Sequence, residues 1–127
     1  REAPRFAFDP IPGSDLVEIP VTTALLGKRR LAAGGGGFFR VLPYSFTRWA
    51  IRQVNSDHRP AVFYFHPWEV DPDQPRVSNA SVRSRLRHYT NLSRMAGKLS
   101  DLLGDFAWGR MDEVAAKERS RSVKWAA

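Results

Sequence analysis

The sequence contains no cysteine and no long apolar run. Without cysteine among its 127 residues, the chain has no disulfide, no thiolate zinc site and no cysteine nucleophile. No apolar stretch approaches the roughly 20 residues that a bilayer-spanning helix needs, so we expect no membrane span. There is no signal-peptide pattern and the first residue is Arg1, so we interpret the chain as a piece of a longer one.

Acidic residues are also scarce compared with basic ones. The formal net charge is +7, from 20 Lys and Arg against 13 Asp and Glu, while 43% hydrophobic and 12% aromatic residues are enough for one folded domain. The basic residues are scattered and surround no nucleic-acid motif, so we expect no nucleic-acid partner. They favour a solvated basic surface, with binding to an anionic polymer as the alternative.

The most informative stretch is AVFYFHPWEVDPDQP at residues 61–75. Its first five residues are apolar without polar alternation, which predicts a strand buried on both faces and bounded by prolines. His66 follows at the strand end, where parallel sheets and barrels place their ligand sites. The stretch therefore predicts a functional histidine beside Trp68 and Glu69.

The N-terminal half of the chain gives weaker signals. Residues 15–21 are a short strand candidate that includes Glu18, and residues 22–33 fit no single element. The glycines at 34–37 predict either a flexible connection into a helix or a loop that borders a ligand. Residues 44–55 then show the apolar spacing of an amphipathic helix.

The C-terminal half predicts one long helix. From Ser81, apolar residues recur at spacings of three and four up to Gly104, with Ser81 as the N-terminal cap and Gly104 as the C-terminal one. Residues 106–108 are a strand candidate, and residues 111–117 add a helical turn or two. Helix, short loop and buried strand in this order predict an α/β fold with short parallel strands.

His66 is the main candidate for chemistry. A histidine transfers protons near neutral pH, although one at a strand end can equally be a structural residue bonded to a backbone carbonyl. His58 lies in a polar loop, and His88 falls at a surface position of the long helix. Glu69 or Asp71 could hold the charge of a protonated His66, and the loop matches no metal-binding motif.

Three stretches together carry a resemblance to a known family: GGGFFRVLPY at residues 35–44, AVFYFHPWEVDPDQPR at residues 61–76 and RHYTNL at residues 87–92. They look like the C-terminal part of polysaccharide deacetylases, closest to the branch found in exopolysaccharide loci linked to PEP-CTERM/exosortase sorting. The resemblance implies that residues 1–114 form the C-terminal portion of a distorted (β/α) barrel, followed by a polar, frayed tail at 115–127. It covers nearly the whole chain.

The resemblance also implies roles for individual residues. Enzymes of this family remove N-acetyl groups from amino sugars, using a divalent metal, zinc or similar, held by an Asp and two His, with a further Asp as base and a late His as acid. The late motif matches His66, which implies that His66 protonates the leaving amine. Substrate-binding roles follow for Trp68, Glu18, Phe39 and Arg40.

The family's metal and base motifs are missing from this sequence. There is no TFDDG-like and no His-Ser-x-x-His segment, so we expect the metal ligands outside this chain and this fragment alone to be inactive. The expected partners are a polysaccharide substrate and the missing N-terminal half of the domain, without which exposed apolar faces favour self-association.

A second interpretation is a non-catalytic accessory module that binds an anionic or amino-sugar polymer. The sequence leaves open the polysaccharide, the metal, the role of residues 87–91, and whether the protein acts in the bacterial cytoplasm or the cell envelope.

Overall fold

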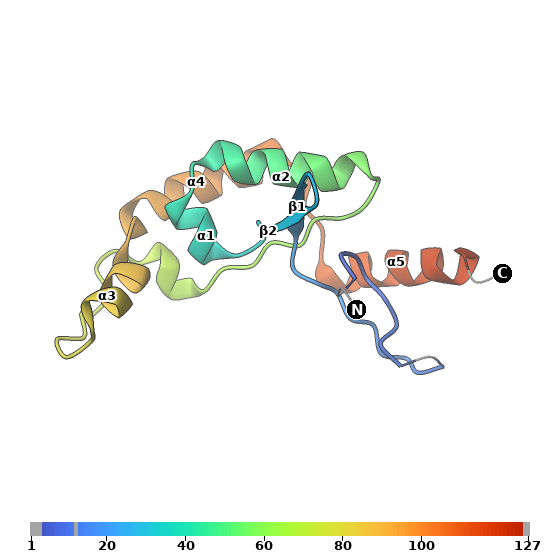
Figure 1. Cartoon of the computed structure of the whole chain (residues 1–127), viewed down its shortest axis with the longest axis horizontal. Coiled ribbons are helices and arrows are strands. Elements are labelled where there is room, and N and C mark those ends of the chain that lie inside the picture. Colours follow the sequence, from blue (N-terminus) through green and yellow to red (C-terminus); the bar gives the residue numbers. More distant parts are fainter. Residues whose placement is uncertain (1–3, 12, 126–127) are drawn as a thin grey trace.

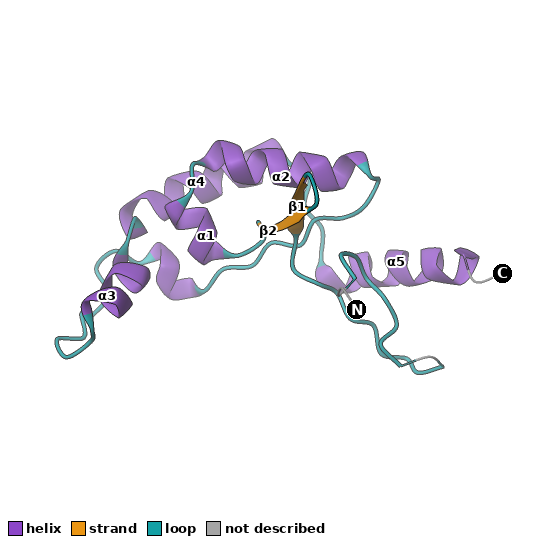
Figure 2. Cartoon of the chain, in the orientation of Figure 1, coloured by secondary structure: helices purple, strands orange, loops and turns teal. Residues whose placement is uncertain are grey.

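The chain folds into several helices and one small hairpin (Figures 1 and 2). The structure, a computed structural model, describes residues 4–11 and 13–125. Its sheet consists of β1 (Thr23–Leu26) and β2 (Arg29–Ala32). Its helices are α1 (Gly36–Val41), α2 (Tyr44–Ser56), the 3-10 helix η1 (Pro67–Val70), α3 (Val82–Tyr89), α4 (Leu92–Asp105) and α5 (Met111–Trp125).

The predicted portion of a (β/α) barrel with short parallel strands is wrong. The only sheet among the described residues is two-stranded and antiparallel, and most of the ordered elements are helical. Residues 61–65 are extended beside the glycine run, but a single parallel bridge, Gly35 with Tyr64, joins them. Pairing stops there because α1 begins at Gly36, and Pro67 opens η1 on the other side. Tyr64 and Phe65 are consequently exposed rather than buried on both faces.

The hairpin lies in the stretch whose sequence fits no single element. Gly27 supplies the positive φ of 59° that a tight turn between β1 and β2 requires. The side chain of Gln53 on α2 bonds both the N–H and the carbonyl of Leu25, at 2.6 and 2.8 Å. The strand expected at residues 15–21 is reduced to one antiparallel bridge between Phe8 and Glu18.

Helix α2 confirms the amphipathic pattern, because it runs from Tyr44 to Ser56 where a helix over residues 44–55 is predicted. Its apolar face packs onto β1 and onto α4, which lies beside it in Figure 1. One buried core cluster consists of Phe39, Ile51, Met95 and Leu102, and a second, smaller one consists of Ala24, Ala33 and Ala50. Phe63 meets Phe39 edge to face with ring centroids 4.9 Å apart, so part of the 61–65 stretch does contribute to this core.

The predicted long helix is broken into two. Ser81 caps the first part as predicted, since its Oγ accepts the N–H of Ser84 at 3.2 Å. Thr90 is extended at the end of α3, and Asn91 then adopts a left-handed conformation with φ of 56° from which α4 starts in a new direction. Asparagine tolerates this conformation better than most residues. Gly104 is not the C-terminal cap, because α4 continues to Asp105.

The C-terminal segment is helical rather than extended. Residues 106–108 form no strand, and the indole N–H of Trp108 donates to the carbonyl of Leu102 at 3.2 Å. Helix α5 reaches Trp125, well beyond the one or two turns expected, and runs through most of the predicted tail. Residues 126–127 lie outside the described part of the chain. Among the described helices, none combines the length and apolar character needed to cross a membrane.

The hydroxyl of Tyr44 links the start of α2 to the end of α4 and predicts a pH dependence of stability. It donates to Oδ2 of Asp105 at 2.6 Å, and burial together with this bond raises the pKa of Tyr44 to about 12. The unfolded chain has the ordinary tyrosine pKa of 10.0, so it loses this proton first. The free energy of unfolding should therefore fall as the pH rises from about 10 to about 12. Urea unfolding across this range should show a shallower fall for Tyr44→Phe, and identical profiles would contradict the prediction.

Candidate functional site

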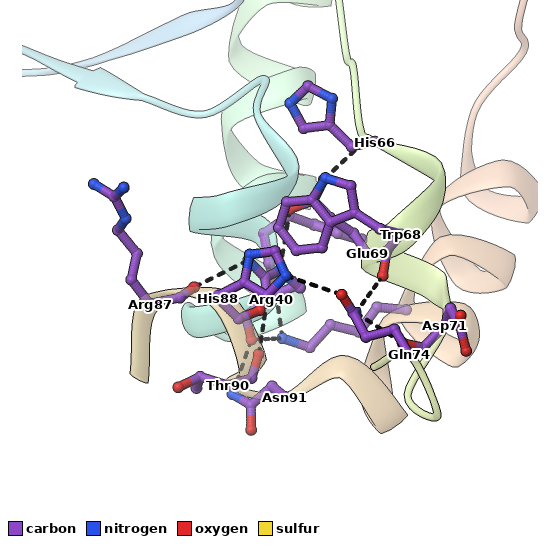
Figure 3. A network of polar contacts seen from close by, with 12 residues as sticks. Arg40, His66, Trp68, Glu69, Asp71, Gln74, Arg87, His88, Thr90 and Asn91 are labelled. Carbon is purple, nitrogen blue, oxygen red and sulfur yellow. Dashed lines mark hydrogen bonds and ion pairs between the residues drawn. The ribbon is translucent and has the colours of Figure 1, made fainter. Parts of the chain in front are cut away.

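The three stretches that carry the family resemblance meet at one pocket of about 560 Å³ (Figure 3). Its size is within the range of about 300–1,000 Å³ typical of small-molecule sites. Each stretch contributes to the lining: Gly36 and Arg40, His66 and Trp68, and Arg87 and His88. Residues 61–65 deliver His66 to the pocket, α1 presents Arg40 from one side, and α3 closes another side.

Arg40 is a charged group of the site that is almost fully buried, with 3% of its side chain exposed. Its Nε–H donates to Oε1 of Glu69 at 3.1 Å. Its Nη1 donates to the carbonyls of His88 and Thr90 at 2.7 and 3.0 Å, and its Nη2 to that of Arg87 at 3.2 Å. These carbonyls belong to the last turn of α3 and to the residue after it. Carbonyls at a helix C-terminus have no donor within the helix. Arg40 therefore fixes the end of α3 as well as a carboxylate.

Glu69 connects Arg40 to the His66 segment. It lies in η1 with 2% of its side chain exposed, and its Oε2 accepts the backbone N–H of His66 at 2.8 Å. Its carboxylate packs against Gly36, where a Cβ atom would lie 2.7 Å from Cδ of Glu69 and even closer to Oε2. Only glycine fits at this position of α1. Close packing against Glu69 therefore explains one glycine of the run.

The end of α1 is held from α4. The Lys98 ammonium donates to the carbonyls of Phe39, Arg40 and Leu42 at 3.0, 3.1 and 2.7 Å. A cation is favourable here because the helix C-terminus carries partial negative charge. Burial, with the nearby charge of Arg94, lowers the pKa of Lys98. The amide of Asn91 donates to the carbonyl of Arg40 at 2.9 Å. The residue at the break between α3 and α4 therefore also binds the end of α1.

Aromatic rings form a row along the pocket. His66 is parallel to Trp68 with centroids 5.9 Å apart, and Trp68 stacks on His88 at 4.1 Å. Nε2–H of His88 donates to Oε1 of Gln74 at 2.9 Å, and the amide of Gln74 donates to the carbonyl of Trp68 at 2.8 Å. The guanidinium of Arg40 lies 5.1 Å from the Trp68 ring centre. His88 is thus oriented by its neighbours, with its ring on one face of Trp68.

His66 is placed differently. Its side chain is exposed, and its ring is separated from the Arg40 and Glu69 network that Figure 3 draws below it. Among the described residues no hydrogen bond joins its imidazole to a backbone carbonyl, so it is not the carbonyl-bonded structural histidine that is the alternative from sequence. Glu69 holds His66 through the main chain, whereas Asp71 is exposed and accepts the N–H of Asp73. The general-acid role of His66 stays a prediction.

The other predicted substrate-binding residues are dispersed. Trp68 lines the pocket, half-buried. The side chain of Glu18 is exposed, and its backbone forms a β-bridge with Phe8 outside the pocket. Phe39 belongs to the core, with 1% exposed, and Arg40 uses four of its five donors within the protein. Their substrate-binding roles stay predictions.

Sequence reasoning misses the buried Arg40–Glu69 pair and the position of His88. A carboxylate in a proline-rich loop is ordinarily exposed, so burial of Glu69 has no local signal. The sequence places His88 on a helix surface because the apolar periodicity continues across the break at Asn91. The available signal is the RHYTNL stretch itself, for which the resemblance implies no role.

The divalent metal implied by the resemblance does not fit the described side chains. In this part of the chain, no three His, Asp or Glu residues come together in a group that could hold a metal ion. That the ligands of such a metal lie outside this chain stays a prediction.

A family model described as "Domain of unknown function (DUF3473)" matches residues 1–116. No curated protein and no solved structure matches the chain. The family description names no activity, so a relation to polysaccharide deacetylases rests on the sequence resemblance alone.

The packing of Gly36 predicts a large difference between two neighbouring glycines. Gly36→Ala should lower the free energy of unfolding by about 1–3 kcal/mol, because the new methyl group overlaps the fixed Glu69 carboxylate. Gly37→Ala is the matched control: a Cβ there meets nothing within 4 Å, and alanine in a helix is favoured by about 0.5–1 kcal/mol. Urea unfolding of both variants checks this, and a Gly36→Ala protein as stable as Gly37→Ala would contradict the geometry.

The buried pair predicts a second contrast. Arg40→Met should cost about 3–5 kcal/mol of unfolding free energy, since it leaves Glu69 buried without its partner. Arg48→Met serves as control, because Arg48 pairs with Asp105 at 3.0 Å but is 43% exposed. That loss should be about 0–1 kcal/mol. Equal losses in denaturant melts would show that Arg40 is not the central anchor.

Proposed function

The chain belongs to the DUF3473 family, and we propose that this domain is the C-terminal part of a polysaccharide N-deacetylase whose pocket supplies the general acid, His66. The substrate class is a polymer that contains N-acetylated amino sugars. The metal ligands and the catalytic base would come from the N-terminal half of the complete domain. This fragment alone is expected to release no acetate.

One observation carries the proposal: three stretches far apart in the sequence, singled out by their resemblance to deacetylases, line a single pocket. A purely structural origin of these stretches would not require their side chains to share a cavity. The pocket has aromatic rings for the apolar faces of sugars and an exposed histidine at its edge. These are the parts that binding and protonating an amino sugar need.

The acid step follows from the surroundings of His66. As the C–N bond of the acetamide breaks, the departing nitrogen needs a proton, which an imidazolium can give near neutral pH. The backbone N–H of His66 is fixed by the carboxylate of Glu69, while its side chain is exposed and its ring lies parallel to that of Trp68. An exposed ring on a fixed backbone can approach the substrate. Glu69 then acts as a positioning residue for His66.

The second candidate function is a non-catalytic module that binds the same polymer. It is favoured by the exposed arginines of α3 that stand beside aromatic rings in the pocket. Such a module would bind saccharide equally well with or without an ionisable group at position 66.

The test is His66→Ala in the full-length protein, with acetate release from an N-acetylated chitooligosaccharide as the assay. We expect kcat to fall on the order of 10²-fold or more, the usual effect of losing a positioned acid. KM and the melting temperature should change little, because the side chain is exposed and its ring contacts with Tyr64 and Trp68 lie outside the buried core. The control is His58→Asn, which removes another exposed histidine and keeps a residue that tolerates its φ of 55°. An unchanged kcat in His66→Ala would falsify the acid assignment and favour the binding module.

A further inference from the structure

The charges that face the pocket are strongly unequal. Glu69 is the only acidic residue among the described lining residues. Its carboxylate forms an ion pair with Arg40 and accepts the backbone N–H of His66. Arg40 in turn uses its donors on Glu69 and the α3 carbonyls. This pair therefore contributes almost no net charge to the cavity.

Two further cations line the pocket without such compensation. Arg85 and Arg87 project from α3, both are exposed, and within the described residues neither forms an ion pair. The carbonyl of Arg87 is held by Arg40, whereas its side chain extends away from that network in Figure 3. The backbone of this part of α3 is thus anchored, whereas the side chains of Arg85 and Arg87 extend from it without an ion pair among the described residues.

Aromatic rings line the same pocket as these two cations. Tyr89 is the last residue of α3 and packs edge to face on His88, with centroids 4.6 Å apart. Arg76, which lies outside the lining of this pocket, places its guanidinium 4.8 Å from the centre of the Tyr89 ring. Aromatic faces suit the apolar faces of sugar rings, and guanidinium groups bind carboxylates through two parallel hydrogen bonds. Both kinds of group occur here in one cavity.

We propose that the pocket selects an acidic saccharide, in which carboxylate-bearing sugars accompany the N-acetylated ones, and that Arg85 and Arg87 bind the carboxylates. This inference rests on the proposed function, because it assigns the N-acetyl sugar to the His66 side of the same pocket. It gives the net charge of +7 a specific use at this site in addition to solubility.

The experiment compares two probes on the full-length protein by isothermal titration calorimetry. A hyaluronan hexasaccharide alternates glucuronate with N-acetylglucosamine, whereas chitohexaose carries N-acetylglucosamine without any carboxylate. We expect tighter binding of the hyaluronan probe, and a preference that shrinks as the ionic strength rises. Equal affinities, or a preference for chitohexaose, would overturn the proposal.

The double variant Arg85→Gln/Arg87→Gln should weaken hyaluronan binding by about tenfold, the effect expected from two partly exposed ion pairs, and leave chitohexaose binding unchanged. The matched control is Arg83→Gln/Arg94→Gln, which removes the same charge from exposed positions that do not line the pocket. An equal loss in the control would mean that overall charge alone attracts the acid, and the proposal would fall.

Acetate release separates this proposal from the deacetylase assignment. If chitohexaose is deacetylated in a His66-dependent manner while the Arg85/Arg87 variant binds both probes normally, the acidic selectivity fails and the deacetylase remains. If the variant loses only hyaluronan binding and neither probe releases acetate, the acidic selectivity stands and the deacetylase fails.

Discussion

The ion pair of Arg40 with Glu69 is the interaction on which the site depends. Burying either charge alone would cost several kcal/mol, so each must be satisfied almost completely. Arg40 achieves this with four donor bonds, and Glu69 with one bond from Arg40 and one from the His66 backbone. Because these partners come from α1, η1 and the end of α3, one buried pair fixes the relative positions of three segments.

Local patterns predict the elements that are stabilised locally. The helix at residues 44–55 and the Ser81 cap are both confirmed, because periodicity and a cap side chain are properties of neighbouring residues. The break at Asn91 is missed because it depends on Arg40, 51 residues away, whose carbonyl binds the Asn91 amide. The extended stretch at 61–65 resembles a doubly buried strand because apolar content does not reveal how few backbone partners are available.

The sequence identifies the stretches that line the candidate site, but it does not predict the contacts between their side chains. The resemblance marks three stretches, and these do share a pocket. Their spacing alone gives no reason to bring His88 next to Trp68 or to bury Glu69. Composition likewise describes the arginines as a scattered basic surface, since a linear sequence cannot show that Arg85 and Arg87 border one cavity. Tertiary contacts decide each of these features.

Helix α3 has an unusual mode of attachment: none of its residues is buried, and its last turn is held through main-chain carbonyls. Every amino acid has a carbonyl, so this anchor is indifferent to which side chains α3 carries. The side chains that face the pocket can therefore be exchanged during evolution while the framework that holds them is kept. Members of one lineage could adapt to chemically different polymers by altering about two turns of helix, without having to redesign a core.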